Sequence, residues 1–182
     1  MDAGHTVLAI PVPPLEAFVR SRTAHYDEAY LGAPDFGQAH VTLLAPWLRT
    51  PAEEDIARVA SLVERTPAFA YELTGVATFP DGTIHLEVAP QEPFRELTSA
   101  LRSAWPWLTP YEGRFGSEVA PHLTLDAEAG GVDAEAVRAM LPVTLPVRAT
   151  AHQVQLQWWQ AGSCHVQHAW SLSPQSDTQG AS

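Results

Sequence analysis

The sequence predicts an α+β fold made of two lobes related by an approximate two-fold axis. The first observation is a repeated strand motif, HVTL at residues 40–43 and HLTL at residues 122–125, with one copy in each half of the 182 residues. The second is the order of elements around each copy, which in both halves runs strand, helix, motif strand, helix and strand. A single His-x-Thr pair is common by chance on a half-exposed strand. Two copies with the same apolar partners and the same surroundings favour a duplicated unit.

The first half begins with an apolar run that Pro13 and Pro14 close. Apolar residues at helical spacing then predict a helix, because proline is tolerated in the first helical turn. Thr50 is the expected N-cap of a second helix, with Pro51 and acidic residues in its first turn. Expected elements, in order, are a strand at 6–12, a helix from 15, a loop at 23–38, the motif strand at 40–45, a helix from 50, and a hairpin of 69–79 and 83–89. The aromatic loop at 23–38 either folds over a ligand or is pinned to the surface.

The second half repeats this plan. Its expected elements are a helix at 94–105, an irregular stretch at 107–120, the motif strand at 122–125, a short helix capped by Asp133, and strands at 143–159 and 165–172. We expect residues 1–172 to form a single bilobal domain. Residues 173–182 are polar, and we expect them to form a disordered tail.

Composition limits the classes of partner. Net charge is −11, and all ten basic residues are arginines. The sequence has no cluster of basic residues of the kind that binds long nucleic acid, so we expect no extended nucleic-acid groove. The sequence contains no run of about 18 apolar residues, so we expect no membrane span. The N-terminus lacks the basic and then apolar pattern of a secretory signal. Cys164 is the only cysteine and cannot form an internal disulfide, which fits a reducing cytoplasm. We therefore expect a cytoplasmic protein, monomeric and without membrane contact, that binds a small ligand.

Histidine and threonine share one face of each motif. Successive strand side chains point to opposite faces, so His40 lies beside Thr42, and His122 lies beside Thr124. Histidine has an ordinary pKa of about 6.5, and two histidines in one cleft can therefore hold opposite protonation states. One imidazole then accepts a proton while the other donates one, and the hydroxyls bind non-bridging phosphate oxygens. These roles suit phosphodiester cleavage, especially the opening of a ribose cyclic phosphate, without a metal.

The two motifs, in a duplicated strand-helix plan over residues 5–172, resemble the two-histidine phosphoesterase superfamily. Its members include bacterial 2′-5′ RNA ligase-like proteins and cyclic nucleotide phosphodiesterases. The resemblance implies two antiparallel sheets facing across a central cleft, with helices on the outside. It implies metal-independent and cofactor-free action on 2′,3′-cyclic phosphate or 2′-5′ phosphodiester bonds of nucleotides or RNA ends, with a role in RNA processing. It also implies that His40 and His122 are catalytic and that Thr42 and Thr124 bind the substrate phosphate.

The second motif departs from the pattern of many bacterial relatives, in which a small and then a basic residue follow. Here Asp126, Ala127 and Glu128 follow. By alternation Asp126 shares a face with His122, where a carboxylate would raise the histidine pKa and repel a phosphate. Any basic contribution must come from elsewhere, and Arg114 is our first candidate for phosphate binding, with Arg49 second. For each of them taken alone, a plain surface arginine is the more common case.

Aromatic side chains near the motifs could stack on a base at the rim of the cleft. The expected stacking residues are Trp47, Phe115 and Trp158; one of Trp158 and Trp159 should lie in the core, because the two point to opposite faces.

Other histidines have simpler interpretations. His85 is expected to be a half-exposed strand residue rather than a third catalytic group. His152, His165 and His168 lack the spacing of a metal site, so we expect no metal.

Two further functions stay open beside the enzyme. The protein could be a non-catalytic nucleotide or RNA-end binding module that keeps the two-histidine cleft, which the acidic residues after the second motif favour. It could also be a scaffold without a ligand site.

Overall fold

The computed structural model describes residues 4–108 and 119–174. Twelve main elements follow one another in these residues: β1 (His5–Pro11), α1 (Glu16–Tyr26), β2 (His40–Leu44), α2 (Glu53–Glu64), β3 (Phe69–Thr78), β4 (Thr83–Ala89), α3 (Glu92–Ala104), β5 (His122–Ala127), α4 (Ala134–Met140), β6 (Val147–Ala151), β7 (Gln153–Trp159) and β8 (His165–Ser171). Short 3-10 turns occur at η1 (Pro13–Leu15), η2 (Glu28–Tyr30) and η4 (Glu128–Gly130). The α+β class and the element order around each motif are as predicted.

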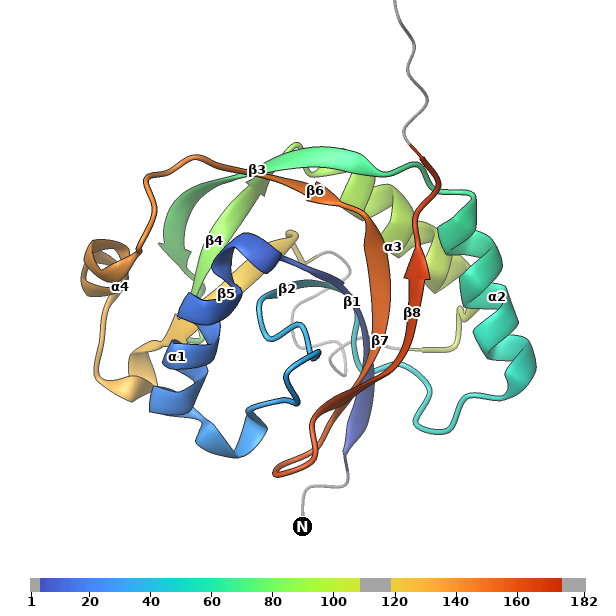
Figure 1. The fold of residues 1–182 in the computed structure, drawn as a ribbon, viewed down its shortest axis with the longest axis horizontal. Coiled ribbons are helices and arrows are strands. Elements are labelled where there is room, and N and C mark those ends of the chain that lie inside the picture. The colour runs from blue at the N-terminus through green and yellow to red at the C-terminus, as the bar shows by residue number, and fades with distance from the viewer. Residues whose placement is uncertain (1–3, 109–118, 175–182) are drawn as a thin grey trace, which may run out of the picture.

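The strands form one sheet rather than the two separate sheets that we expected. Their order is β6-β3-β4-β5-β2-β1-β7-β8, and each neighbouring pair is antiparallel. The expectation was wrong because the motif strands β2 and β5 pair directly, with Val41 across from Leu123. This pairing joins the two lobes, β6-β3-β4-β5 and β2-β1-β7-β8, into a continuous sheet. Figure 1 shows that the sheet curls into a half-barrel.

Each lobe contains two strands from each half of the chain. The lobe β6-β3-β4-β5 takes β3 and β4 from the first half and β5 and β6 from the second, and the lobe β2-β1-β7-β8 takes β1 and β2 from the first half and β7 and β8 from the second. The run expected as one strand at 143–159 is divided at His152, between β6 and β7. Because β6 pairs with β3 and β7 pairs with β1, this run connects the two lobes on the side away from the motif strands.

Apolar residues on one face of the motif strands form the core. Val41 and Leu43 on β2 and Leu123 and Leu125 on β5 are buried in a large hydrophobic cluster with residues of all four helices. Figure 1 shows α2 and α3 together on one flank of the sheet, while α1 and α4 lie toward the other. The core face therefore fixes which way the alternate residues of β2 and β5 must point.

Two cap predictions have different outcomes. Asp133 caps α4 as expected, since its Oδ1 accepts a hydrogen bond from Ala136 N at 2.8 Å. Thr50 is not the N-cap of α2, which begins at Glu53. Instead, Asp55 in the first turn accepts from the backbone N–H of Ala52 at 3.0 Å, so an acidic side chain inside the helix performs the capping.

The expected disordered tail at residues 173–182 is only partly covered by the described residues. Ser173 donates from its N–H to Thr66 O at 2.9 Å and accepts from Ala68 N, while residues 175–182 of the expected tail lie outside the described part of the chain.

Among the helices that the structure describes, none has the length and apolarity needed to cross a bilayer.

Candidate functional site

The four motif side chains meet where the two lobes join. With Val41 paired to Leu123 in antiparallel register, His40 lies across from Thr124, and Thr42 lies across from His122. Val41 and Leu123 are fully buried in the core, so the four polar side chains point to the opposite face. The structure thus brings together the four residues that the sequence singled out, in a diagonal arrangement of two imidazoles and two hydroxyls.

Both motif imidazoles are held in the same way. His40 Nδ1 donates to Gln38 O at 2.9 Å, and His122 Nδ1 donates to Ala120 O at 2.8 Å. In each case the acceptor is the carbonyl two residues before the histidine. A carbonyl can only accept, so Nδ1 has the proton in the neutral ring and Nε2 has the lone pair. Both histidines therefore offer Nε2 to a ligand.

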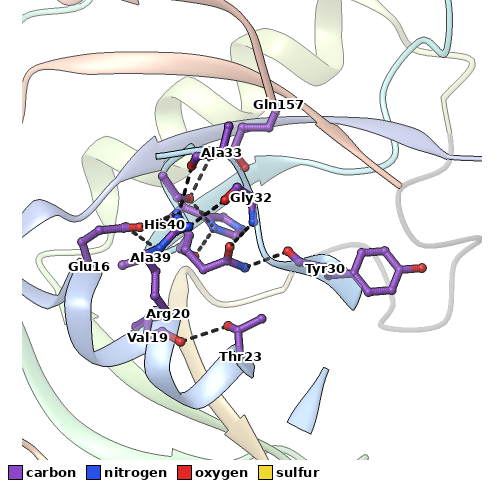
Figure 2. Close-up of polar contacts among 12 residues, drawn as sticks. Glu16, Val19, Arg20, Thr23, Tyr30, Gly32, Ala33, Ala39, His40 and Gln157 are labelled. Atoms are coloured by element: carbon purple, nitrogen blue, oxygen red, sulfur yellow. Dashed lines mark hydrogen bonds and ion pairs between the residues drawn. The ribbon is translucent and has the colours of Figure 1, made fainter. Parts of the chain in front are cut away.

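The segment before His40 is tied to α1 and β7. Glu16 on α1 accepts hydrogen bonds from Ala39 N at 2.9 Å and from Gln38 N at 3.2 Å, and Arg20 donates to Gly32 O at 2.6 Å (Figure 2). Gln157 on β7 donates to Gly37 O at 3.0 Å. These contacts hold the loop before His40, for which both a ligand cover and a loop pinned to the surface were open, and they fix the backbone at His40.

Gly37 allows the close approach of this loop to the sheet. A Cβ at this position would lie 2.8 Å from Gln155 Oε1 and 2.9 Å from Pro11 Cβ, distances too short for any side chain. Any larger residue would therefore displace the loop and the carbonyls near His40 Nδ1.

The electrostatics of the free protein favour neutral imidazoles. The pKa of His122 is lowered to about 4, chiefly by burial; His85 and His40 also lower it, whereas the Ala120 carbonyl and Asp81 act in the raising direction. Burial also lowers the pKa of His40. Burial thus favours the neutral form of both rings in the free protein, and a bound anion would raise either pKa.

Asp126 does not act on His122 as expected. Its side chain is fully buried and accepts a hydrogen bond from Arg22 Nε on α1 at 2.5 Å and another from Ala127 N. The groups that shift the His122 pKa do not include Asp126. The prediction that Asp126 would raise this pKa was wrong because it treated the carboxylate as unpaired, whereas Arg22 from the other half of the chain pairs with it. The expected repulsion of a phosphate by Asp126 stays a prediction.

A pocket of about 210 Å³ opens beside His40 and Thr124. Residues of α1, of the segment that follows it and of β7 form the rest of the lining: Val19, Thr23, Tyr26, Asp27, Tyr30, Gln38 and Trp159. The Trp159 ring lies 5.3 Å from the His40 ring and 6.3 Å from the Tyr30 ring, centroid to centroid. The pocket thus offers aromatic surface next to the motif residues.

The predicted stacking residues are placed differently. Trp47 is 4% exposed and packs edge to face on Trp105 in the core, so it is not at a rim. Trp159, not Trp158, lines the pocket, because the two indoles point to opposite faces of β7 and Trp159 shares the face of His40. Phe115 and the predicted phosphate ligand Arg114 lie outside the described residues, whereas Arg49 is exposed after β2.

Several solved structures have a similar fold. E. coli LigT complexed with NADP+ has a TM-score of 0.59 at 19% identity, covering 93% of this chain and 98% of that one. TT0787 of Thermus thermophilus has a TM-score of 0.58 at 18% identity, with 93% and 98% covered. A structure described as a phosphoesterase has a TM-score of 0.56 at 19% identity, with 93% and 99% covered. At these identities the likeness concerns the fold.

A family model described as the 2′-5′ RNA ligase superfamily matches residues 11–163, which include both motifs. The chain belongs to this superfamily. The resemblance inferred from the two motifs is thereby confirmed, and membership supports an enzyme of the phosphoesterase and ligase type in general. No curated protein sequence matches the chain.

One residue of this superfamily member was misjudged from its sequence. His85, expected to be half-exposed, is 5% exposed and lies 5.3 Å from the His122 ring, centroid to centroid. Alternation along β4 indicated a face for His85, but only the pairing of β4 with β5 brings that face to the motif. Within the described residues, no group of three His, Cys, Asp or Glu side chains is arranged to hold a metal.

Proposed function

We propose that this member of the 2′-5′ RNA ligase superfamily is a metal-independent phosphodiesterase acting on 2′,3′-cyclic phosphate or 2′-5′ phosphodiester bonds of nucleotides or RNA ends. One observation supports this most strongly. His40 and His122 lie diagonally across the β2–β5 pairing, each beside a threonine, each with Nδ1 bound to a carbonyl and Nε2 available.

The pocket suggests which histidine acts on which oxygen. It adjoins His40, so a nucleoside bound there would place its ribose oxygens on the His40 side of the phosphorus. In hydrolysis of a cyclic phosphate, His122 Nε2 accepts a proton from water as the water oxygen bonds to phosphorus. The opposite P–O bond to the ribose breaks, and the ribose oxygen takes a proton from His40 Nε2. His40 is then the general acid and His122 the general base.

The neutral state of both rings fits these roles once substrate is bound. The low pKa of His122 leaves it unprotonated and able to accept a proton at neutral pH. The negative phosphate raises the pKa of His40, so that the acid is charged with a proton as substrate binds. Thr42 and Thr124 donate hydrogen bonds to the non-bridging oxygens, whose negative charge grows as water attacks.

The pocket favours a nucleotide as the substrate. Tyr30 and Trp159 offer ring faces to a base, and Asp27 offers a carboxylate for its edge. LigT has been solved with 3′-AMP, ATP and NADP+, which are all nucleotides. We propose a small nucleotide or an RNA 2′,3′-cyclic phosphate end as the ligand of a cytoplasmic monomer, in keeping with a sequence that contains a single cysteine.

The test is hydrolysis of a panel of 2′,3′-cyclic nucleotides, ADP-ribose cyclic phosphate and 2′-5′-linked dinucleotides in EDTA. We expect turnover of at least one cyclic or 2′-5′ compound, abolished in the His40→Gln/His122→Gln double variant. The matched control is His168→Gln, because His168 lies exposed on β8. Full activity in the double variant, or activity lost in EDTA and restored by zinc, would contradict the proposal.

A binding module without turnover is the second candidate. The observation that favours it is that burial disfavours the protonated, acid form of both histidines in the free protein. Calorimetry with a 2′,3′-cyclic nucleotide and a nucleoside monophosphate, combined with product analysis, separates the two candidates. Tight binding without product supports the module, whereas product formation supports the enzyme.

A further inference from the structure

The rings of Phe79, His85 and His122 form a cluster beside the second motif. His85 has no role in the mechanism above. His85 on β4 stacks on Phe79, with centroids 3.7 Å apart and planes 15° from parallel. His122 meets this stack edge to face, 4.8 Å from Phe79 and 5.3 Å from His85. The cluster therefore places a third imidazole in contact with one of the two motif imidazoles.

His85 belongs to the face of the sheet that bears the motif residues. It pairs with Thr124 in the β4–β5 register, and antiparallel partners point to the same face. Its Nδ1 bonds to Thr83 O at 3.3 Å, the carbonyl two residues before, as in both motif histidines. The remaining ring nitrogen, Nε2, is thus the atom that a ligand can reach.

Opposing groups act on the charge of His85. Burial lowers its pKa, while the carbonyl of Thr83 and the negative charges of Glu87 and Asp81 raise it. Glu87 lies on the same strand, Asp81 lies in the turn before it, and β3 opposes His85 with Ala77, which does not titrate. On β5 the facing titratable group is His122. His85 therefore has acidic neighbours that favour a proton, which burial opposes.

Positive charge near the described site is largely committed elsewhere. Arg22 is paired with the buried Asp126, and Arg20 is bound to Glu16 and to the carbonyls of the loop before His40. A cyclic phosphodiester has one negative charge, whereas the phosphomonoester produced from it has close to two at neutral pH. The second charge needs a further proton or cation.

We propose that His85 is a third phosphate-binding imidazole, which takes up a proton from solvent at Nε2 when a phosphomonoester dianion occupies the cleft. This inference rests on the proposed function for the location of the phosphate. The site then binds nucleoside 2′- or 3′-monophosphates more tightly than the cyclic ester, and binding of the monoester consumes an extra proton. No covalent bond changes in this step.

Isothermal titration calorimetry tests the proposal. Inorganic phosphate, a nucleoside 2′-monophosphate and the 2′,3′-cyclic nucleotide are titrated at pH 7 in buffers of different ionisation enthalpy, which counts the protons taken up. The variants are His85→Gln and His85→Phe; the second keeps an aromatic ring stacked on Phe79 without a titratable nitrogen. His168→Gln is the matched control. We expect the His85 variants to bind the monoester roughly 10- to 100-fold more weakly, to take up fewer protons, and to bind the cyclic ester within about 3-fold of wild type.

Each outcome of the titrations supports or overturns the proposed role of His85. Unchanged proton uptake and an unchanged ratio of monoester to cyclic affinity in both variants would show that His85 only packs against His122. Failure of wild type to bind phosphate in any form would overturn the inference together with the proposed function. Proton uptake that depends on His85, in a protein that hydrolyses nothing, would support the inference and contradict only the enzymatic proposal.

Discussion

The two halves of the site share a backbone plan but differ in chemistry. Antiparallel pairing places Pro11 and Ala9 of β1 across from His40 and Thr42. The corresponding neighbours on β4, across from His122 and Thr124, are Glu87 and His85. The imidazole, the hydroxyl and the Nδ1 contact thus occur in both halves, while the strand beside them is apolar in one half and titratable in the other.

The same contrast occurs two residues after each threonine. Leu44 is buried and apolar in the first half, and the corresponding Asp126 is buried and paired with Arg22 in the second. Trp159 of the pocket lies beside His40, whereas the imidazole of His85 lies beside His122. Under the proposed function, the first half therefore lies next to the organic part of the ligand, and the second half has an additional titratable group.

The largest expected effect comes from removing either imidazole. We expect His40→Ala and His122→Ala each to lower kcat/KM on a cyclic phosphate by about 10²- to 10⁴-fold, the usual contribution of general acid-base catalysis. If the halves differ as described, the acidic limb of the pH profile disappears only in His122→Ala, and the basic limb only in His40→Ala. Identical profiles would show that the halves do not have separate roles.

Stability tests the buried ion pair of the second half. We expect Asp126→Leu to destabilise the protein by about 3–5 kcal/mol, because Arg22 is left buried without its partner. The Asp126→Leu/Arg22→Leu double variant, which resembles the first half at Leu44, should recover most of this loss. Urea denaturation gives both values. The control is Arg148→Leu in an exposed pair with Glu72, expected to change stability by less than about 1 kcal/mol. If the double variant is as unstable as Asp126→Leu, the loss of stability does not come from leaving Arg22 without its partner.

The pH dependence of stability is the next effect in size. The folded-state pKa of His122 is about 4, below its ordinary value of 6.5. The unfolded chain therefore binds more protons between these values, so stability decreases as pH falls from about 6.5 towards 4. His122 contributes at most about 3 kcal/mol to this loss. Denaturation at several pH values should show a smaller loss in His122→Gln, and saturating phosphate should reduce the loss in wild type. Equal losses in wild type and variant would refute the low pKa.

The smallest expected effect concerns the aromatic side of the first half. Trp159→Ala should raise KM for a cyclic nucleotide by an amount equivalent to about 1–3 kcal/mol, with kcat changed less, if the indole stacks on the base. Trp158→Ala is the matched control, because its ring lies on the opposite face of β7. Steady-state kinetics distinguishes the two. Similar increases in KM for both variants would contradict the placement of Trp159 at the nucleoside site.

Local sequence patterns were sufficient for the elements and for the four motif residues. The His-x-Thr repeat has a period of two, so alternation gives the face of each side chain without knowledge of its neighbours. Alternation also showed that Trp158 and Trp159 face opposite ways. It could not show which one faces the pocket, because that depends on the register between β7 and β1.

Long-range contacts account for the errors. Asp126 was treated as a free carboxylate because its partner Arg22 lies 104 residues away in sequence. His85 became a neighbour of His122 only through the β4–β5 pairing, and the single sheet arose from one pairing between the motif strands. Composition and spacing within a segment contain no information about such partners.

The mixing of the two halves in both lobes has a consequence for fragments of this molecule. In each four-stranded lobe, two strands come from the residues before α3 and two from the residues after it. A fragment that ends between β4 and β5 therefore contains no complete lobe and exposes the unpaired edges of β3 and β1, which are sites for aggregation.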